Sequence, residues 1–296
     1  MKKIILHIGY HKTGTTFLNR MFFPAHQDVH HLGKPFDIDS PIREIIERVI
    51  GIKKYDADRC KKLYEKHIEP FRKDKIVTIS DGRIVKCIVN DNLTEIPKRL
   101  MDITSEISVI IVIRQQYDYL KSLYVQKVGV DNEKKSFDEW FDSNWEDGAQ
   151  LKKQLSYSDK IQAYVDIFGE ENVGVFLYEK FRNNGKEFLQ DICKFIGLDC
   201  TALCKEINNS KILNQRMTTM HRLTKRYAML NYISILIKKI TPKNILGLIK
   251  KIIFKNFKSY DPELSEDRLK LVQEHARLVN NKLINEFDLD LYKYEH

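Results

Sequence analysis

Apolar runs and helical patterns alternate along most of this 296-residue chain. Continuous runs rich in β-branched residues are typical of strands buried on both faces of a parallel sheet. Such runs cover residues 3–8, 75–80, 108–113 and 173–178. Between them, apolar residues recur at helical spacing and predict helices over residues 15–23, 41–50, 56–70, 91–104, 115–128, 157–168 and 185–196. The alternation predicts an α/β fold with three layers around a central parallel sheet.

The remaining segments are less regular. Residues 28–41 contain two prolines and predict a loop near the site, whereas residues 131–150 form a polar, aromatic-bearing excursion that we interpret as a substrate-side insertion. Residues 264–287 carry an apolar stripe typical of core packing, formed by Leu269, Val272, Ala276, Val279, Leu283 and Phe287. We expect a core over residues 1–205 and a helical C-terminal cap over residues 206–296, packed on the same core.

The first predicted strand leads directly into a loop that suits an anion. Residues 7–16 read His-Ile-Gly-Tyr-His-Lys-Thr-Gly-Thr-Thr. A loop of this kind aligns backbone N–H groups, the ammonium group of Lys12 and hydroxyl groups at a helix N-terminus. Gly9 and Gly14 also have the spacing of the P-loop in nucleotide triphosphatases, but Thr15 stands where that motif has its lysine. A Mg²⁺-dependent P-loop kinase acting on a nucleotide or small molecule is therefore the alternative function.

A second motif follows the strand predicted over residues 108–113. Arg114 comes directly after this strand, and Ser122 lies eight residues further on in the next predicted helix. Together, the two motifs resemble those of sulfotransferases that use 3′-phosphoadenosine 5′-phosphosulfate (PAPS), especially the bacterial, carbohydrate-type enzymes. A third stretch, Phe168–Glu179, resembles a strand and its flanks in the same family. The resemblance implies a P-loop-like α/β fold.

The resemblance also implies roles for individual residues. PAPS would be the sulfuryl donor and 3′,5′-adenosine bisphosphate the product, without a metal. Lys12 would stabilise charge on the bridging oxygen, and Arg114 and Ser122 would bind the 3′-phosphate. Tyr178 would lie near the adenine, although packing on the following helix is an equal alternative. The residues expected to hold the 5′-phosphate, besides Lys12, are Thr13, Gly14, Thr15 and Thr16.

The acceptor hydroxyl needs a general base, for which the sequence offers three candidates. Asp81 closes a predicted strand where cytosolic relatives place a catalytic histidine. His31 falls near the position at which glycan-modifying relatives carry a catalytic glutamate. We rank these two level and place His11, within the anion loop, third. For each histidine, a surface position without a catalytic role is an equal alternative.

Positive charge is concentrated in one segment. Residues 207–260 contain twelve Lys and Arg and no Asp or Glu, a charge of +12 compared with +9 for the whole chain. Lysines alternate with apolar runs, as in amphipathic helices that lie on a membrane surface. Three interpretations compete: an anionic membrane surface where lipid-linked glycans are made, a groove for an acidic polysaccharide, and a packed helical cap with solvated lysines. Nucleic acid is not an expected partner, because no recognition motif accompanies the charge.

Other features point to a cytoplasmic enzyme. The five cysteines form no even framework, and no apolar stretch reaches the roughly 18–20 residues that a membrane span needs. We expect a cytoplasmic sulfotransferase, peripheral on the inner membrane face if the basic segment docks there. Its acceptor would be a hydroxyl or amine of a sugar in a glycan or glycolipid. A membrane-docked binding protein without turnover is the non-enzymatic alternative, against which Lys12, Arg114 and Ser122 argue.

Overall fold

The computed structural model describes residues 2–33, 36–88, 93–145, 150–199, 260–287, 289 and 291. The chain divides into two compact units. The first unit draws on residues 1–115, 150–211 and 275–296, and the second on residues 116–149 and 212–274.

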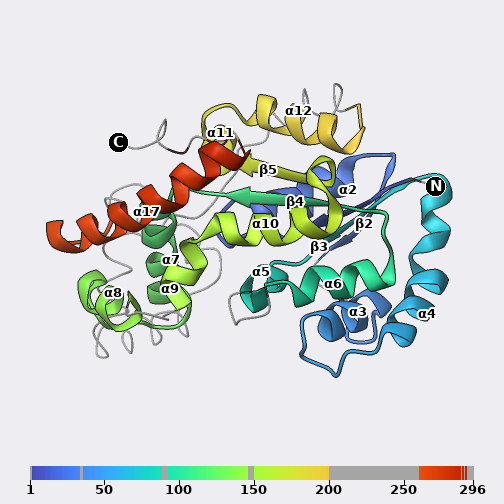
Figure 1. The fold of residues 1–296 in the computed structure, drawn as a ribbon, viewed down its shortest axis with the longest axis horizontal. Helices are drawn as coiled ribbons and strands as arrows, with labels where there is room; N and C mark the ends of the chain where they lie inside the picture. The colour runs from blue at the N-terminus through green and yellow to red at the C-terminus, as the bar shows by residue number, and fades with distance from the viewer. Residues whose placement is uncertain are drawn as a thin grey trace, which may run out of the picture. The chain divides into compact units, whose positions relative to one another are not determined.

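The first unit is built on a parallel sheet (Figure 1). Its described strands have the order β2-β3-β1-β4-β5 and are β1 (Ile4–His7), β2 (Val29–Gly33), β3 (Ile76–Ser80), β4 (Ile107–Ile113) and β5 (Val173–Leu177). Strand β1 lies in the centre, where Ile4 pairs with Val77 on one side and with Ile107 on the other. Every residue of β1, β3 and β4 is buried, which confirms the expected parallel α/β sheet.

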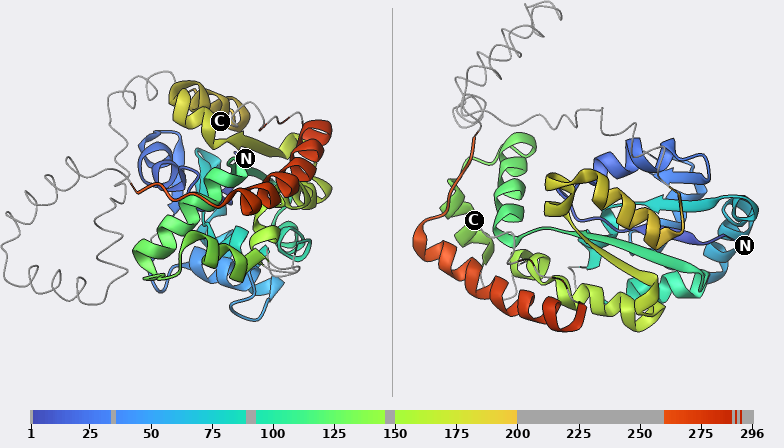
Figure 2. Two further views of the ribbon diagram at one scale, coloured as in Figure 1. Left: turned by 90° about the vertical axis from the view of Figure 1, so that its left-hand side faces the viewer. Right: turned by 90° about the horizontal axis from the view of Figure 1, so that it is seen from above.

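Helices cover both faces of this sheet (Figure 2). One face carries α1 (Thr15–Phe17), the π-helical turn η1 (Leu18–Phe22), α2 (Phe23–Ala25), α11 (Tyr178–Asn183) and α12 (Gly185–Ile196). The core on this face joins Ile5 of β1 to Phe22 and Ile192. The other face carries α3 (Pro41–Val49), α4 (Ala57–His67), α6 (Glu95–Ile103) and α10 (Tyr157–Phe168). Because successive strand residues point to opposite faces, Ile4 and Leu6 belong to this second core.

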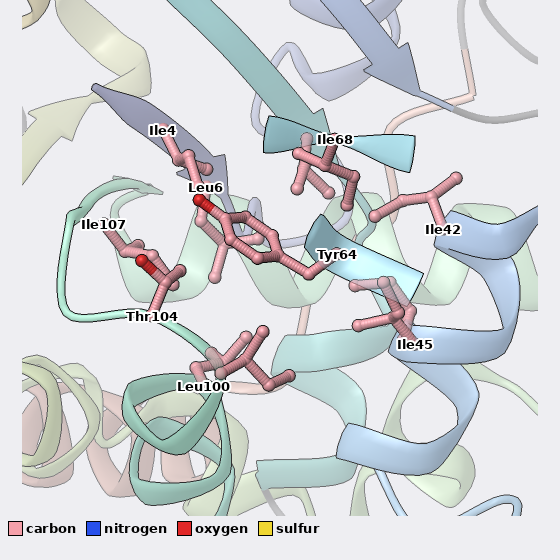
Figure 3. Close-up of a pocket in the computed structure, with 12 residues that line it drawn as sticks. Ile4, Leu6, Ile42, Ile45, Tyr64, Ile68, Leu100, Thr104 and Ile107 are labelled. Carbon is pink, nitrogen blue, oxygen red and sulfur yellow. The ribbon is translucent and has the colours of Figure 1, made fainter. Parts of the chain in front are cut away.

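A small cavity lies within the second core (Figure 3). It measures about 30 Å³ and is lined almost entirely by aliphatic side chains, among them Leu6, Ile45 and Leu100. A space of this size holds no more than a water molecule, and its walls offer water few hydrogen-bond partners. We therefore regard it as a packing void rather than a ligand site.

One sequence prediction about the sheet is wrong. Residues 28–41 were expected to form a loop, but Val29–Gly33 form the edge strand β2, in which His31 pairs with Thr78 of β3. An edge strand pairs with a neighbouring strand on one side only. Most residues of β2 are only half-buried, so the strand does not need a continuous run of apolar residues. The sequence Val-His-His-Leu-Gly consequently lacks the signal that marks the buried strands.

The second unit contains α7 (Gln116–Val130) and α8 (Phe137–Trp145). The ring of Tyr124 on α7 stacks on Phe137 at 4.7 Å and lies 5.6 Å from Trp140. Trp140, Phe141 and Trp145 are all buried, so these aromatic side chains serve packing. The substrate-side position of this excursion stays a prediction.

The long helix α17 (Glu266–Phe287) spans the C-terminal stripe. Val272, Ala276, Val279 and Leu283 are buried, which confirms the expected core packing, while Leu269 and Phe287 are half-buried. Residues 207–259 of the basic segment, and the expected boundary at residue 205, lie outside the described residues. None of the helices in the described part of the chain combines the length and hydropathy that crossing a membrane requires.

Candidate active site

The loop between β1 and α1 is held together by its own hydroxyl groups. The side chains of Thr13 and Thr15 both donate to the carbonyl oxygen of Tyr10, at 2.7 and 2.8 Å. Lys12 and Gly14 adopt left-handed backbone conformations, with φ of 67° and 78°. Alternation of left- and right-handed residues bends a chain so that its N–H groups converge on a concavity, which is how backbone nests bind anions. The loop is therefore shaped as an anion cradle.

Two of the three threonines in this cradle, Thr13 and Thr15, donate their hydroxyl groups within the loop. Thr13 is fully buried, and its hydroxyl donates inside the loop, which leaves only its backbone N–H for a ligand. Thr16 is exposed. The N–H groups of Thr15 and Thr16 open a helical segment, where no intrahelical acceptor exists. Backbone groups rather than the Thr13 hydroxyl are thus available to an anion.

Arg114 brings a second positive charge to the cradle. Because parallel strands end at the same edge of the sheet, the end of β4 lies beside the loop that follows β1. Nη1 of Arg114 donates to the carbonyl oxygen of Lys12 at 3.3 Å. Burial, and after it the charge of Arg114, lowers the pKa of Lys12. The two cations repel one another, so a bound anion would stabilise both.

The aromatic ring of Tyr178 packs against Arg114. The guanidinium carbon sits 4.8 Å from the centre of the Tyr178 ring, which also contacts Phe181 at 6.0 Å. Glu179 accepts a hydrogen bond from the backbone N–H of Gln115 at 3.0 Å and so ties α11 to the end of β4. The ring therefore packs on its own helix and against Arg114, and its predicted contact with adenine stays a prediction.

A pocket of about 320 Å³ opens next to the cradle. Its lining residues are His11, Thr15, Thr16, Asn19, Arg20, Ser80 and Gly82. All of them belong to the first unit, and every side chain among them is polar. Sequence reasoning missed Asn19, Arg20, Ser80 and Gly82. Asn19 and Arg20 could have been found, because they follow Thr15 and Thr16 by one helical turn.

The structure separates the three candidate bases. His11 is exposed and lines the pocket. His31 instead bonds to the hydroxyl of Thr78 and to Oδ1 of Asn19, both at 2.7 Å, and burial lowers its pKa to about 4. His31 is not among the residues that line the pocket, although its partner Asn19 is. The order suggested by the sequence, with His11 last, therefore differs from the order of access to the pocket.

Asp81 is the third candidate and is not among the pocket-lining residues. Its Oδ1 accepts from the backbone N–H of Arg83 at 2.8 Å, and its Oδ2 accepts from Arg83 Nε at 2.9 Å. The carboxylate is buried in this ion pair. The geometry favours a role in holding the turn that carries Gly82, and the predicted catalytic role stays a prediction.

Ser122 lies on α7, within the second unit. It is half-buried there. Its predicted contact with the 3′-phosphate stays a prediction.

The buried His7 and the half-buried His31 predict a loss of stability in mild acid. Burial, and after it the charge of His31, lowers the pKa of His7 from its usual 6.5 to about 3, so the unfolded chain binds more protons than the folded one between these values. The free energy of unfolding should fall by about 2 kcal/mol from His7 alone between pH 6.5 and 5. His31 acts in the same direction. The measurement is the urea midpoint at pH 7 and pH 5.

The variant His7→Asn supplies the control for this titration. It should show a smaller difference between the two midpoints than the wild type. The lowered pKa of Glu47, about 2, adds stability that is present above pH 4.5 and is lost only as the pH falls below it, so Glu47 hardly affects the difference between pH 7 and pH 5. Equal midpoints of the wild type at pH 7 and pH 5 would contradict the prediction.

The fold described above is shared with a known protein. A sulfotransferase from Alicyclobacillus acidocaldarius has a similar fold, with a TM-score of 0.59 and 16% sequence identity over 100% of this chain and 99% of that one. A mouse sulfotransferase complexed with PAP gives a TM-score of 0.48 and 13% identity over 99% of this chain and 89% of that one. No curated protein sequence matches significantly. The sequence profile of the sulfotransferase domain matches residues 2–277, and the chain therefore belongs to the sulfotransferase family.

Proposed function

We propose that the protein transfers a sulfuryl group from PAPS to a hydroxyl or amine of a sugar and releases 3′,5′-adenosine bisphosphate. One observation carries the proposal: the backbone cradle, Lys12 and Arg114 meet at the carboxyl ends of β1 and β4. Two cations and aligned N–H groups suit a nucleotide that carries phosphate at both its 3′ and 5′ positions. The mouse sulfotransferase complexed with PAP, a molecule of this kind, supports the assignment.

The donor side of the reaction follows from the charges in the cradle. When an acceptor oxygen attacks sulfur in line, the bond from sulfur to the bridging oxygen breaks and negative charge builds on the departing phosphate. The Lys12 ammonium and the N–H groups of Thr15 and Thr16 would stabilise that charge. Arg114 would hold the 3′-phosphate, and Tyr178 would lie beside the base. Lys12 is thus proposed as the residue that acts on the transition state.

The pocket next to the cradle, which we take as the acceptor pocket, suits a sugar as the acceptor. Its volume of about 320 Å³ and its hydroxyl, amide, imidazole and guanidinium groups suit a ring with several hydroxyl groups. A flat phenolic or steroid acceptor would need the apolar lining that most small-molecule pockets have. The glycan or glycolipid class is therefore our proposal. We also propose that the basic segment, residues 207–260, docks on an anionic membrane surface. This docking would place the enzyme on the inner membrane face.

A thermal-shift measurement tests the donor assignment. At a concentration one hundred times Kd, a ligand stabilises the folded state by about 2.7 kcal/mol, which shifts Tm by several degrees. We expect this shift with 3′,5′-adenosine bisphosphate in the presence of EDTA and none with ATP and Mg²⁺. The reverse pattern would support a P-loop kinase and overturn the proposal.

The pocket geometry makes His11 our first choice for the general base, ahead of Asp81 and His31. We expect His11→Ala to abolish the acidic limb of the pH–rate profile and to lower kcat by on the order of a hundredfold. The comparison is with His67→Ala, a replacement on α4 outside the pocket. If His11→Ala kept the acidic limb and Asp81→Asn or His31→Ala removed it, the base would be one of those residues instead.

A further inference from the structure

A buried histidine and a serine form a hydrogen-bonded pair in the wall of the pocket. Ser80 ends β3 and lines the pocket, and His7 ends β1. The two residues are register partners in the parallel sheet. Oγ of Ser80 lies 2.9 Å from Nδ1 of His7. Two rigid strands therefore fix the position of this hydroxyl.

The surroundings of His7 decide which ring nitrogen carries its proton. His7 is fully buried, and its lowered pKa leaves the ring neutral, with a single N–H. Nε2 has no hydrogen-bond partner in the described part of the chain. It lies against the backbone of the cradle, since a Cβ at Gly9 would approach it to 2.6 Å. A buried N–H without an acceptor is rarer in proteins than an unused acceptor, so the proton belongs on Nδ1.

This proton position determines what Ser80 offers to the pocket. With Nδ1–H donating to its oxygen, the serine keeps its own hydroxyl hydrogen for another acceptor, and Ser80, although almost completely buried, is among the residues that line the pocket. His7 then cannot accept the serine proton. The pair therefore differs from the serine–histidine pairs that activate a nucleophile, in which the histidine accepts that proton. Ser80 becomes a fixed hydrogen-bond donor.

We propose that Ser80 is a specificity-determining residue of the acceptor pocket, that its O–H donates to a non-reacting oxygen of the sugar, and that His7 is its positioning residue. The proposal rests on the proposed function. The oxygen bound by Ser80 is not the one that attacks sulfur, because a donor there would occupy the lone pair that forms the new bond. A sugar has ring and hydroxyl oxygens next to the reacting position. Binding one of them orients the reacting one.

Sulfuryl transfer to a panel of methyl glycosides, with water as a second acceptor, tests this role. Ser80→Ala should lower kcat/KM for the best glycoside about tenfold, mainly through KM. The slow hydrolysis of PAPS to sulfate should be unchanged, because water needs no orientation, and so should the Tm shift with 3′,5′-adenosine bisphosphate. Ser108→Ala is the matched control: it removes another buried serine hydroxyl, one that bonds Asn172 near the opposite edge of the sheet.

Variants of His7 separate positioning from packing. An asparagine amide can place an N–H close to the position of Nδ1, so His7→Asn should keep most of the glycoside activity. His7→Leu should lose it as Ser80→Ala does. In the wild type, ¹⁵N NMR of the histidine rings should show the Nδ1–H form of His7, with its signal assigned by its loss in His7→Asn.

Several results would overturn the inference. One is a ring with its proton on Nε2, and another is an equal loss of glycoside transfer and PAPS hydrolysis in Ser80→Ala. A protein that binds the bisphosphate but sulfates no glycoside would overturn the sugar class and this inference with it. A protein that does not bind the bisphosphate would refute the proposed function, and the NMR result would still decide whether Ser80 is a fixed donor.

Discussion

Replacing Lys12 by alanine is expected to lower kcat by about a hundredfold or more. The ammonium group lies in the anion cradle beside Arg114, where it would meet the charge that develops on the bridging oxygen. Such charge exists only in the transition state, so kcat should fall more than KM rises. The measurement is steady-state sulfuryl transfer from PAPS at saturating acceptor.

Folding should survive this replacement. Alanine and lysine have the same Cβ, so both carry the strain of the left-handed backbone at position 12. Removal of the charge also relieves the repulsion from Arg114, so Tm should not decrease. Lys62→Ala, an exposed replacement on α4, is the control and should match the wild type. Normal turnover by folded Lys12→Ala would remove Lys12 from the mechanism.

Replacing Arg114 by alanine should weaken binding of 3′,5′-adenosine bisphosphate about a hundredfold. The guanidinium offers two parallel N–H donors to a phosphate, and each hydrogen bond to a charged group is worth roughly 1.5–3 kcal/mol. The Tyr178 ring at 4.8 Å and the Lys12 carbonyl at 3.3 Å hold the group in place. Arg114→Lys keeps the charge but not the planar fork, so it should recover only part of the affinity.

A second ligand makes this test specific. 5′-AMP lacks the 3′-phosphate, so its affinity should be nearly the same in the wild type and in Arg114→Ala. Isothermal titration calorimetry with both nucleotides gives the two differences. If Arg114→Ala weakened the two nucleotides equally, Arg114 would act on the cradle as a whole, and its assignment to the 3′-phosphate would be wrong.

The buried parts of the fold could be predicted from the sequence. Helices α10 and α12 occupy the predicted residues, and β4 differs from its prediction by a single residue. These elements are covered by neighbours on several sides, so their apolar pattern is dense and its period is clear. Strand β2 was missed because it forms the edge of the sheet and gains its order from pairing with β3. No local pattern reports such pairing.

The candidate site was only partly predictable, for a related reason. The cradle is one continuous stretch with a motif, and Arg114 ends a strand that its composition marks, so both could be found. Ser80 and His7 are separated along the chain and become a pair only through strand register. The engagement of Asp81 by Arg83 and of His31 by Asn19 likewise depends on side-chain contacts. Residue type alone did not reveal these contacts.

The central position of β1 has a consequence for biosynthesis. Its two neighbours, β3 and β4, begin only at Ile76 and Ile107, so in a nascent chain that ends before Ile107 the strand that leads into the cradle can pair with β3 but not with β4. Pairing β1 with β3 and β4 closes long segments of chain, which costs conformational entropy before the new contacts compensate it. Such long-range pairing makes folding slow. We infer that nucleotide affinity arises late during translation, and that the exposed edge of β1 is the part of the young polypeptide most in need of a chaperone.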